Sequence, residues 1–142
     1  MHITKKVVIV AIYNSNNELL LQERGDYSKH GEQWAFFGGG IEEGEGIEEA
    51  FYRESKEELD LDVRKFDCKY IGEYITYNVL MKRYVLRYTY LIKTDLNESD
   101  FNVLEGSGCK YFSFEDSKKL KHQTNPSRFI EYLKLKIYES NK

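Results

Sequence analysis

One stretch of the chain, Gly38 to Leu61, constrains its fold and its chemistry more than any other. It opens with three consecutive glycines and continues into an acidic, helix-forming segment that contains Glu54, Glu57 and Glu58. Positions i, i+3 and i+4 of a helix share one face, so these three carboxylates lie close together. Like charges at this spacing destabilise a helix, which indicates that a cation compensates them.

A hard divalent cation is the compensating charge that such carboxylates favour. Converging oxygen ligands suit Mg²⁺ or Mn²⁺, whereas zinc prefers nitrogen and sulfur ligands. Mg²⁺ takes only one or two protein carboxylates in most sites and completes its coordination with water and substrate phosphate. The metal then neutralises phosphate oxygens and makes a bound water nucleophilic. The helix therefore predicts a site for phosphoryl chemistry that depends on Mg²⁺ or Mn²⁺.

The spacing within this stretch is more specific than the carboxylates alone. Five residues separate Gly39 from Glu45, and seven separate Glu45 from Arg53. The full pattern specifies Gly39, Glu45, Arg53, Glu54, Glu57 and Glu58. At an average usage of roughly 6–7% for each residue, one register matches by chance about once in 10⁷. The pattern resembles the Nudix box, the signature of a family that uses a divalent metal to hydrolyse nucleoside diphosphates linked to another group.

The charged residues of the box have separate expected roles. We expect Glu54, Glu57 and Glu58 to hold the metal and to take part in catalysis, although the sequence does not decide which one is the general base. Arg53 points away from the mean direction of these glutamates on an ideal helix. We expect it to fix a carboxylate, with Glu45 as the candidate, through a forked hydrogen bond.

The three glycines can bring bare backbone close to a ligand or adopt a positive φ. We assign Gly38 to the metal and Gly39 and Gly40 to the substrate, but the sequence leaves open whether carbonyls face a metal or N–H groups face a phosphate. A P-loop is excluded, because Glu45 and Gly46 stand where that motif requires Lys and Ser or Thr. No dinucleotide-binding fingerprint opens a helix either.

Three residues depart from the family pattern. Ser55 stands where the family has an apolar residue, Asp60 where it has a glycine, and Phe37 where a proline is common. Asp tolerates the left-handed conformation that ends many helices. Ser55 forfeits about 1–2 kcal/mol of apolar burial if the site is buried. Since no carboxylate is changed, we expect an active enzyme.

Apolar periodicity outlines the rest of the chain as alternating strands and helices. Runs rich in β-branched and aromatic residues predict strands at 7–13, 18–23, 34–37, 63–77, 83–94 and 109–114. Helical spacing predicts helices at 46–59 and 128–139 and a helical turn at 115–120. Polar loops are expected at 24–33 and 95–107, and a hairpin turn at 78–82. This α/β order predicts a mixed β-sheet flanked by helices, and the resemblance implies the Nudix α/β/α sandwich in a single domain, residues 1–142.

The resemblance also suggests site residues outside the box. Family members add a carboxylate from a late loop as metal ligand or base, and Glu105 is the candidate, with Glu98 as the alternative. Arg24 stands where nucleotide-cleaving relatives place a phosphate-binding arginine, although a solvated surface arginine is an equally good interpretation. Trp34 or Phe36 would stack on a base if they are not simply core residues.

The substrate is predicted less sharply. A nucleoside triphosphate, including an oxidised one, is the first choice, giving a monophosphate and pyrophosphate. The proline that ADP-ribose-cleaving relatives carry past the box is missing around Tyr77, and a tyrosine there fits dinucleoside-polyphosphate hydrolases. The alternative of another class is a nucleotide sensor that binds without cleaving, and its signature would be the loss of a box glutamate.

Composition bounds the partners. A net charge of −3 offers no basic footprint for a nucleic acid polymer. The apolar run near the N-terminus is too short to span a membrane, and no small-residue cleavage site follows it. Cys68 and Cys109 lack metal or redox spacing and are interpreted as buried thiols in a reducing compartment. We expect a cytoplasmic monomer or homodimer that binds a small nucleotide.

Overall fold

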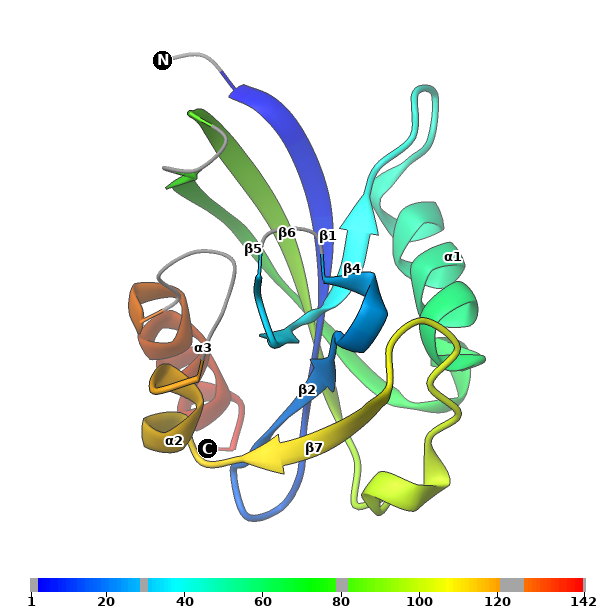
Figure 1. The fold of residues 1–142 in the computed structure, drawn as a ribbon, viewed down its shortest axis with the longest axis vertical. Coiled ribbons are helices and arrows are strands. Elements are labelled where there is room, and N and C mark those ends of the chain that lie inside the picture. Colours follow the sequence, from blue (N-terminus) through cyan, green and yellow to red (C-terminus); the bar gives the residue numbers. More distant parts are fainter. Residues whose placement is uncertain (1–2, 29–30, 79–81, 121–126, 142) are drawn as a thin grey trace.

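The computed structural model describes residues 3–28, 31–78, 82–120 and 127–141. A mixed seven-stranded sheet lies between helices on its two faces, as the sequence predicted (Figure 1). The strands are β1 (Ile3–Tyr13), β2 (Leu19–Glu23), β3 (Trp34–Ala35), β4 (Phe37–Gly40), β5 (Asp67–Asn78), β6 (Arg83–Lys93) and β7 (Gly108–Phe112). The helices are α1 (Ile47–Leu59), α2 (Phe114–Lys118) and α3 (Ser127–Ser140), with short 3₁₀ turns η1 (Gly25–Tyr27), η2 (Val63–Lys65) and η3 (Glu98–Asp100).

Strand β1 is the centre of the sheet. The strand order is β3-β2-β1-β6-β5, while β4 pairs with β1 and β7 pairs with β2. Only the β1–β6 pair is parallel among the strands described; the other pairs are antiparallel. In register, Val7 lies between Gly40 of β4 and Arg87 of β6. The glycine strand therefore runs directly beside the buried part of β1, Val7 to Tyr13.

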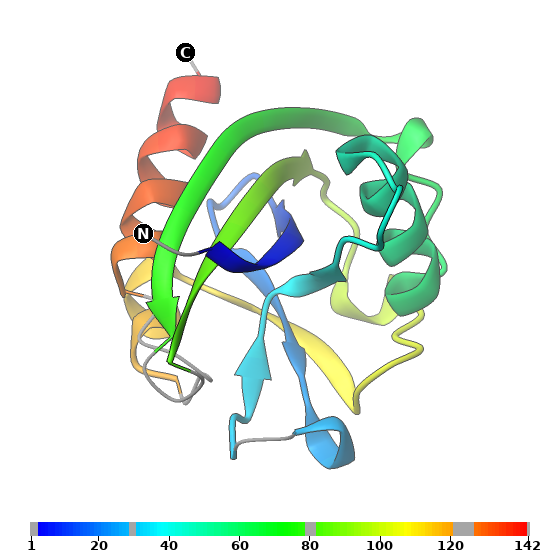
Figure 2. The same cartoon turned by 90° about the horizontal axis from the view of Figure 1, so that it is seen from above.

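Alternation along β1 explains why its sequence is almost continuously apolar. Val8, Val10 and Ile12 face one core, together with Phe51 and Leu59 of α1. The intervening residues of β1 face a second core under α3, formed with Phe129, Ile130, Leu133 and Ile137. A strand that is covered on both faces has no polar side, which gives the unbroken run that the sequence shows. Figure 2 shows the long strands β5 and β6 curving between α3 on one side and α1 on the other.

The glycine segment is extended backbone that pairs with β1. The predicted strand 34–37 is divided: Trp34–Ala35 pairs with β2, whereas Phe37–Gly40 pairs with β1. Gly38 has a φ of 133°, a conformation that residues with a Cβ rarely adopt. A Cβ at Gly38 would also overlap the carbonyl oxygen of Val8. Glycine is needed here for close strand pairing.

Replacing Gly38 by alanine is expected to lower the free energy of unfolding by about 3 kcal/mol or more, because it adds both strain and overlap with β1. Gly40 is the matched control, since an added Cβ there would meet nothing within 4 Å. Urea unfolding of both variants checks the prediction. Equal midpoints for Gly38→Ala and Gly40→Ala would contradict it.

Two predicted strand boundaries differ from the observed ones because a short capped turn or helix stands there. The predicted strand 63–77 begins with the 3₁₀ turn η2, because the Asp62 carboxylate accepts a hydrogen bond from the Arg64 N–H and caps that turn. Similarly, Ser113 caps α2 through the Asp116 N–H, so β7 ends at Phe112. The loop 95–107 contains η3. Of the hairpin turn expected at 78–82, residues 79–81 lie outside the described residues.

Candidate active site

Helix α1 begins and ends through local backbone chemistry. The Glu49 carboxylate accepts the N–H of Gly46, the residue before the helix, at 3.3 Å. At the other end Asp60 adopts the left-handed conformation, with φ 50°, as the sequence predicted for this departure from the family pattern. Ser55 is buried, and within the described residues its hydroxyl has no hydrogen-bond partner. A buried hydroxyl without a partner lowers the stability of the fold, because it has lost its hydrogen bonds to water.

Glu58 is the most deeply buried carboxylate of the box, only 2% exposed. The Gly38 N–H donates to its Oε1 at 2.8 Å, and the Gln22 amide donates to its Oε2 at 3.1 Å. Burial, together with the smaller effect of the charges of Glu54 and Glu105, raises the pKa of Glu58 to about 8. The carboxylate is thus held in one orientation by β2 and β4.

Glu54 packs directly against the glycine strand. A Cβ on Gly39 would lie 2.5 Å from Glu54 Oε1, so the missing side chain leaves room for this carboxylate. Burial also raises the pKa of Glu54, and the nearby charges of Glu57 and Glu105 act in the same direction. Glu57, by contrast, has a side chain that is half exposed.

Arg53 connects the box. Its Nε and Nη2 donate to the two carboxylate oxygens of Glu45 at 2.7 and 2.9 Å, the fork that the sequence predicted. Nη2 also donates to the carbonyl of Gly40 at 2.9 Å. The expectation that Arg53 points away from the other glutamates was wrong: Nη1 donates to Glu54 at 3.0 Å and to Glu57 at 3.2 Å. The long, flexible stem lets the guanidinium reach back along the helix surface.

The loop after η3 brings Glu105 to this cluster. The Leu104 N–H donates to the carbonyl of Glu58 at 2.8 Å, and the Ser107 N–H donates to the carbonyl of Glu23 at 2.9 Å. Glu105 lies between these two anchors, and its charge raises the pKa of both Glu54 and Glu58. The loop is therefore fastened to the C-terminal turn of α1 and to the end of β2.

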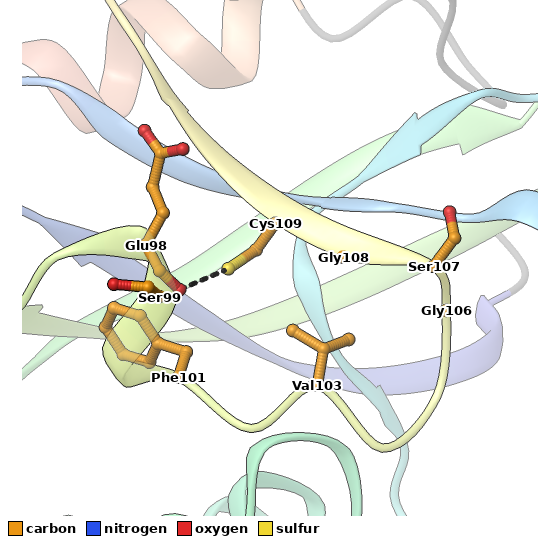
Figure 3. Close-up of a pocket in the computed structure, with 8 residues that line it drawn as sticks. All are labelled: Glu98, Ser99, Phe101, Val103, Gly106, Ser107, Gly108 and Cys109. Carbon is orange, nitrogen blue, oxygen red and sulfur yellow. Dashed lines mark hydrogen bonds between the residues drawn. The ribbon is translucent and has the colours of Figure 1, made fainter.

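Glu98 lies elsewhere. Its carboxylate accepts the Tyr111 N–H at 3.3 Å, and its carbonyl faces Cys109 Sγ at 3.6 Å. It lines an open pocket of about 430 Å³ between η3 and β7 (Figure 3). The pocket is lined by Glu98, Ser99, Phe101, Val103, Gly106, Ser107, Gly108 and Cys109. Because no glutamate of the box lines it, the geometry favours Glu105 over Glu98 as the additional carboxylate.

The predicted substrate contacts are not gathered in one place. Trp34 packs edge-on against Phe112 at 4.8 Å, and Phe36 packs edge-on against Phe129 at 5.3 Å beside the α3 core. Tyr77 is exposed and contacts Tyr84 near the end of the β5–β6 hairpin. Their roles toward a substrate remain predictions.

Arg24 has partners inside the protein. Its Nη1 donates to Gln22 Oε1 at 2.6 Å, its Nη2 donates to the Tyr27 carbonyl, and Glu32 lies 3.8 Å from its Nε. A solvated surface arginine is therefore not what the structure shows. Gln22, the centre of these contacts, was not singled out by the sequence. The signal available was a glutamine that directly follows the apolar run Leu19 to Leu21 within one strand.

The two cysteines are free and only half buried, which corrects the expectation of buried thiols. Burial raises the pKa of Cys68 and of Cys109 to about 11 in each case. Cys68 Sγ donates to the Val63 carbonyl at 3.1 Å. Both are therefore protonated, unreactive thiols near neutral pH.

The carboxylates of Glu54 and Glu58 fit a hard divalent cation, but the described residues do not supply a complete coordination shell. Within the described part of the chain, no three His, Cys, Asp or Glu side chains form a group that could hold a metal ion. Arg53 supplies the positive charge that Glu54 and Glu57 share here. Glu58 and Glu54 remain buried carboxylates that repel one another. Since Mg²⁺ requires only one or two protein carboxylates, these residues fit its chemistry.

The pKa of Glu58 predicts how the metal-free protein responds to pH. An unfolded glutamate ionises near its ordinary value of 4.5, whereas folded Glu58 stays protonated up to about 8. Between these values the folded state binds more protons, so the free energy of unfolding falls as the pH rises. Urea midpoints measured with a chelator from pH 5 to pH 8 check this, and Glu58→Gln should flatten the slope. Parallel slopes in wild type and variant would contradict it.

Comparison with known proteins decides the family. The sequence matches the NUDIX domain over residues 3–133, nearly the whole chain. The chain belongs to the Nudix family. Its members are hydrolases of phosphoanhydride bonds, which agrees with the box geometry described above. No curated protein matches the chain.

Several solved structures share the fold. The MutT protein of Methanosarcina mazei Go1 is 20% identical, with a TM-score of 0.70 over 97% of this chain and 96% of its own. The dihydroneopterin triphosphate pyrophosphohydrolase of E. coli is 19% identical, with a TM-score of 0.67 over 92% and 97%. The NUDIX domain of Shewanella oneidensis NrtR, complexed with ADP ribose, is 14% identical, with a TM-score of 0.72 over 96% and 90%.

None of the helices in the described part of the chain has the length and the apolar composition that a membrane-spanning helix needs.

Proposed function

We propose that this Nudix protein hydrolyses a nucleoside triphosphate, including oxidised forms, to a nucleoside monophosphate and pyrophosphate. The observation that carries the proposal is the buried Glu58, held by Gly38 and Gln22 beside a second buried carboxylate, Glu54. Carboxylates buried at this density are costly for a structural site and useful for a catalytic one. The two free thiols also support a reducing, cytoplasmic location.

The residues divide the work as follows. Glu54, Glu57, Glu58 and Glu105 would hold Mg²⁺ or Mn²⁺, together with the Gly38 carbonyl. When bound, the metal neutralises phosphate oxygens and makes a coordinated water nucleophilic. A carboxylate of this cluster takes the proton of the attacking water, and Arg53 keeps Glu54 and Glu57 in place. Gly39 and Gly40 present backbone without side chains toward the phosphates.

A catalytically silent nucleotide sensor is the second candidate. The observation in its favour is that Arg53 already neutralises Glu54 and Glu57 and that the described residues hold no three-ligand metal cluster. The ADP-ribose complex of the NrtR domain shows a NUDIX domain with a bound nucleotide derivative. We place the enzyme first because every glutamate of the box is present.

A hydrolysis panel with Mg²⁺ tests the two functions. It contains ordinary and 8-oxo nucleoside triphosphates, dihydroneopterin triphosphate, ADP-ribose and diadenosine polyphosphates, with products identified and Glu58→Gln as the inactive control. Turnover of a nucleoside triphosphate to a monophosphate and pyrophosphate, lost in the variant, would support the proposal. Preference for ADP-ribose or a dinucleoside polyphosphate would overturn the proposed substrate but not the hydrolase activity. Tight binding without turnover of any compound would favour the sensor.

A further inference from the structure

Gln22 is a fully buried polar side chain one residue before the end of β2, and it lies under the active site. Alternation along β2 places it on the same face as Leu20, which belongs to the core beneath α1. A buried amide is costly unless its donors and its acceptor are all satisfied. Here each partner of the amide belongs to the catalytic region.

The orientation of the amide follows from its neighbours. A guanidinium can only donate, so the atom of Gln22 that faces Arg24 Nη1 at 2.6 Å must be the carbonyl oxygen. Nε2 then faces two acceptors, Glu58 Oε2 at 3.1 Å and the backbone carbonyl of Glu105. If the amide were reversed, its NH₂ group would face the guanidinium of Arg24, which is also a donor. Its oxygen would face the Glu58 carboxylate, which is also an acceptor. Arg24 thereby fixes the direction in which Gln22 donates.

Arg24 is itself held in place. Its guanidinium lies 3.8 Å from Glu32 Oε1, and the Glu32 side chain is only 5% exposed. Arg24 Nη2 also donates to the Tyr27 carbonyl at 2.9 Å. The chain of contacts from Glu32 through Arg24 and Gln22 to Glu58 is therefore continuous, and it ends at a carboxylate of the box.

The same amide secures the loop that carries Glu105. Gly106 follows that residue with a φ of 119°, and a Cβ there would lie 2.7 Å from the Glu23 carbonyl and 3.1 Å from Gln22 Cγ. The loop backbone thus approaches β2 closely at the point where Gln22 donates. Two of its N–H groups, from Leu104 and Ser107, bond to the carbonyls of Glu58 and Glu23.

We propose that Gln22 is a positioning residue that orients the Glu58 carboxylate and the Glu105 loop relative to each other, with Arg24 and Glu32 fixing the direction of its amide. Gln22 touches neither the substrate nor the reacting atoms in this role. The proposal rests on the proposed function, since it assumes that Glu58 and Glu105 act together on one substrate. Residues that orient a metal-binding carboxylate change metal affinity or activity by about 10–100-fold when they are replaced.

Two variants test the proposal. Gln22→Met removes the amide at similar size, and Gln22→Glu keeps the shape and the acceptor for Arg24 but replaces the donor by a second acceptor. In both, hydrogen exchange of the Leu104 and Ser107 amides in the metal-free protein should accelerate by about 10-fold or more, while exchange in α3 stays unchanged. Mn²⁺ affinity and kcat should each fall by about 10–100-fold, with KM nearly constant.

Glu58→Gln supplies the decisive comparison. If Gln22 acts through Glu58, adding Gln22→Met to Glu58→Gln should lower kcat by a clearly smaller factor than Gln22→Met alone does, because one of the two groups that Gln22 positions is already changed. Thr89→Val is the control, since the Thr89 hydroxyl is fully buried and has no hydrogen-bond partner within the described residues. It should leave loop exchange and kcat unchanged.

The outcomes separate this proposal from the proposed function. Wild-type exchange rates in both Gln22 variants, or kcat losses that simply multiply with that of Glu58→Gln, would overturn the positioning role. A wild-type protein that binds no Mn²⁺ and hydrolyses no nucleotide would overturn the proposed function instead. The exchange measurement still reports whether Gln22 holds the loop in that case, because it needs neither metal nor substrate.

Discussion

Replacing Glu58 by glutamine is expected to lower kcat by about 10³-fold while the protein remains folded. The glutamine amide has almost the shape of the carboxylate and its oxygen can still accept the Gly38 N–H, although its NH₂ group then faces the Gln22 donor in place of Oε2. What disappears is the negative charge and the ability to accept a proton. Steady-state kinetics at saturating Mg²⁺ and nucleoside triphosphate measure the loss, and thermal unfolding checks the fold.

Glu48→Gln is the matched control for this prediction. Glu48 belongs to the same helix, but its side chain is exposed and accepts the Tyr52 hydroxyl at 2.5 Å. Its replacement should leave kcat within twofold of wild type. If Glu58→Gln also stayed within a few-fold of wild type, Glu58 would have no direct part in the reaction.

Patterns of spacing predicted much of this protein. Helical periodicity placed Glu54, Glu57 and Glu58 on α1, and the two-sided burial of β1 is visible in its apolar run. Asp60 in the left-handed conformation and the fork between Arg53 and Glu45 both follow from local chemistry, since each involves residues within about two turns of one helix. Local rules of this kind need no knowledge of the tertiary fold.

The contacts around Gln22 that the sequence did not reveal join segments distant in the chain. The bond from Gln22 to Glu58 spans 36 residues, and that from Gln22 to the Glu105 carbonyl spans 83. Nothing in the composition of β2 marks Gln22 as the residue that meets α1. The strand conformation of the glycines likewise depends on β1, whose backbone lies against Gly38. Only the assembled sheet makes these residues neighbours.

The second large effect is expected at Arg53. Its guanidinium uses all three nitrogens: one side holds Glu45 and the carbonyl of Gly40, and the other holds Glu54. It also keeps the pKa of Glu45 at about 2. Lysine retains the charge but offers a single point donor in place of a planar fork, so it can satisfy only part of this set. Arg53→Lys should therefore lower kcat by about 10–100-fold.

Arg64→Lys provides a matched control, because Arg64 makes the same kind of fork, to Asp62 at 2.9 and 3.1 Å, on an exposed surface. An exposed pair contributes little to stability, so this variant should keep wild-type kcat and thermal stability. Arg53, by contrast, is about three-quarters covered, with a side-chain exposure of 23%. Its variant should also lose about 1–3 kcal/mol of unfolding free energy, because a single ammonium group cannot donate to Glu45, Glu54 and the Gly40 carbonyl at the same time. If Arg53→Lys behaved like Arg64→Lys in both kinetics and urea unfolding, Arg53 would act only as a surface ion pair, and the box glutamates would be positioned without it.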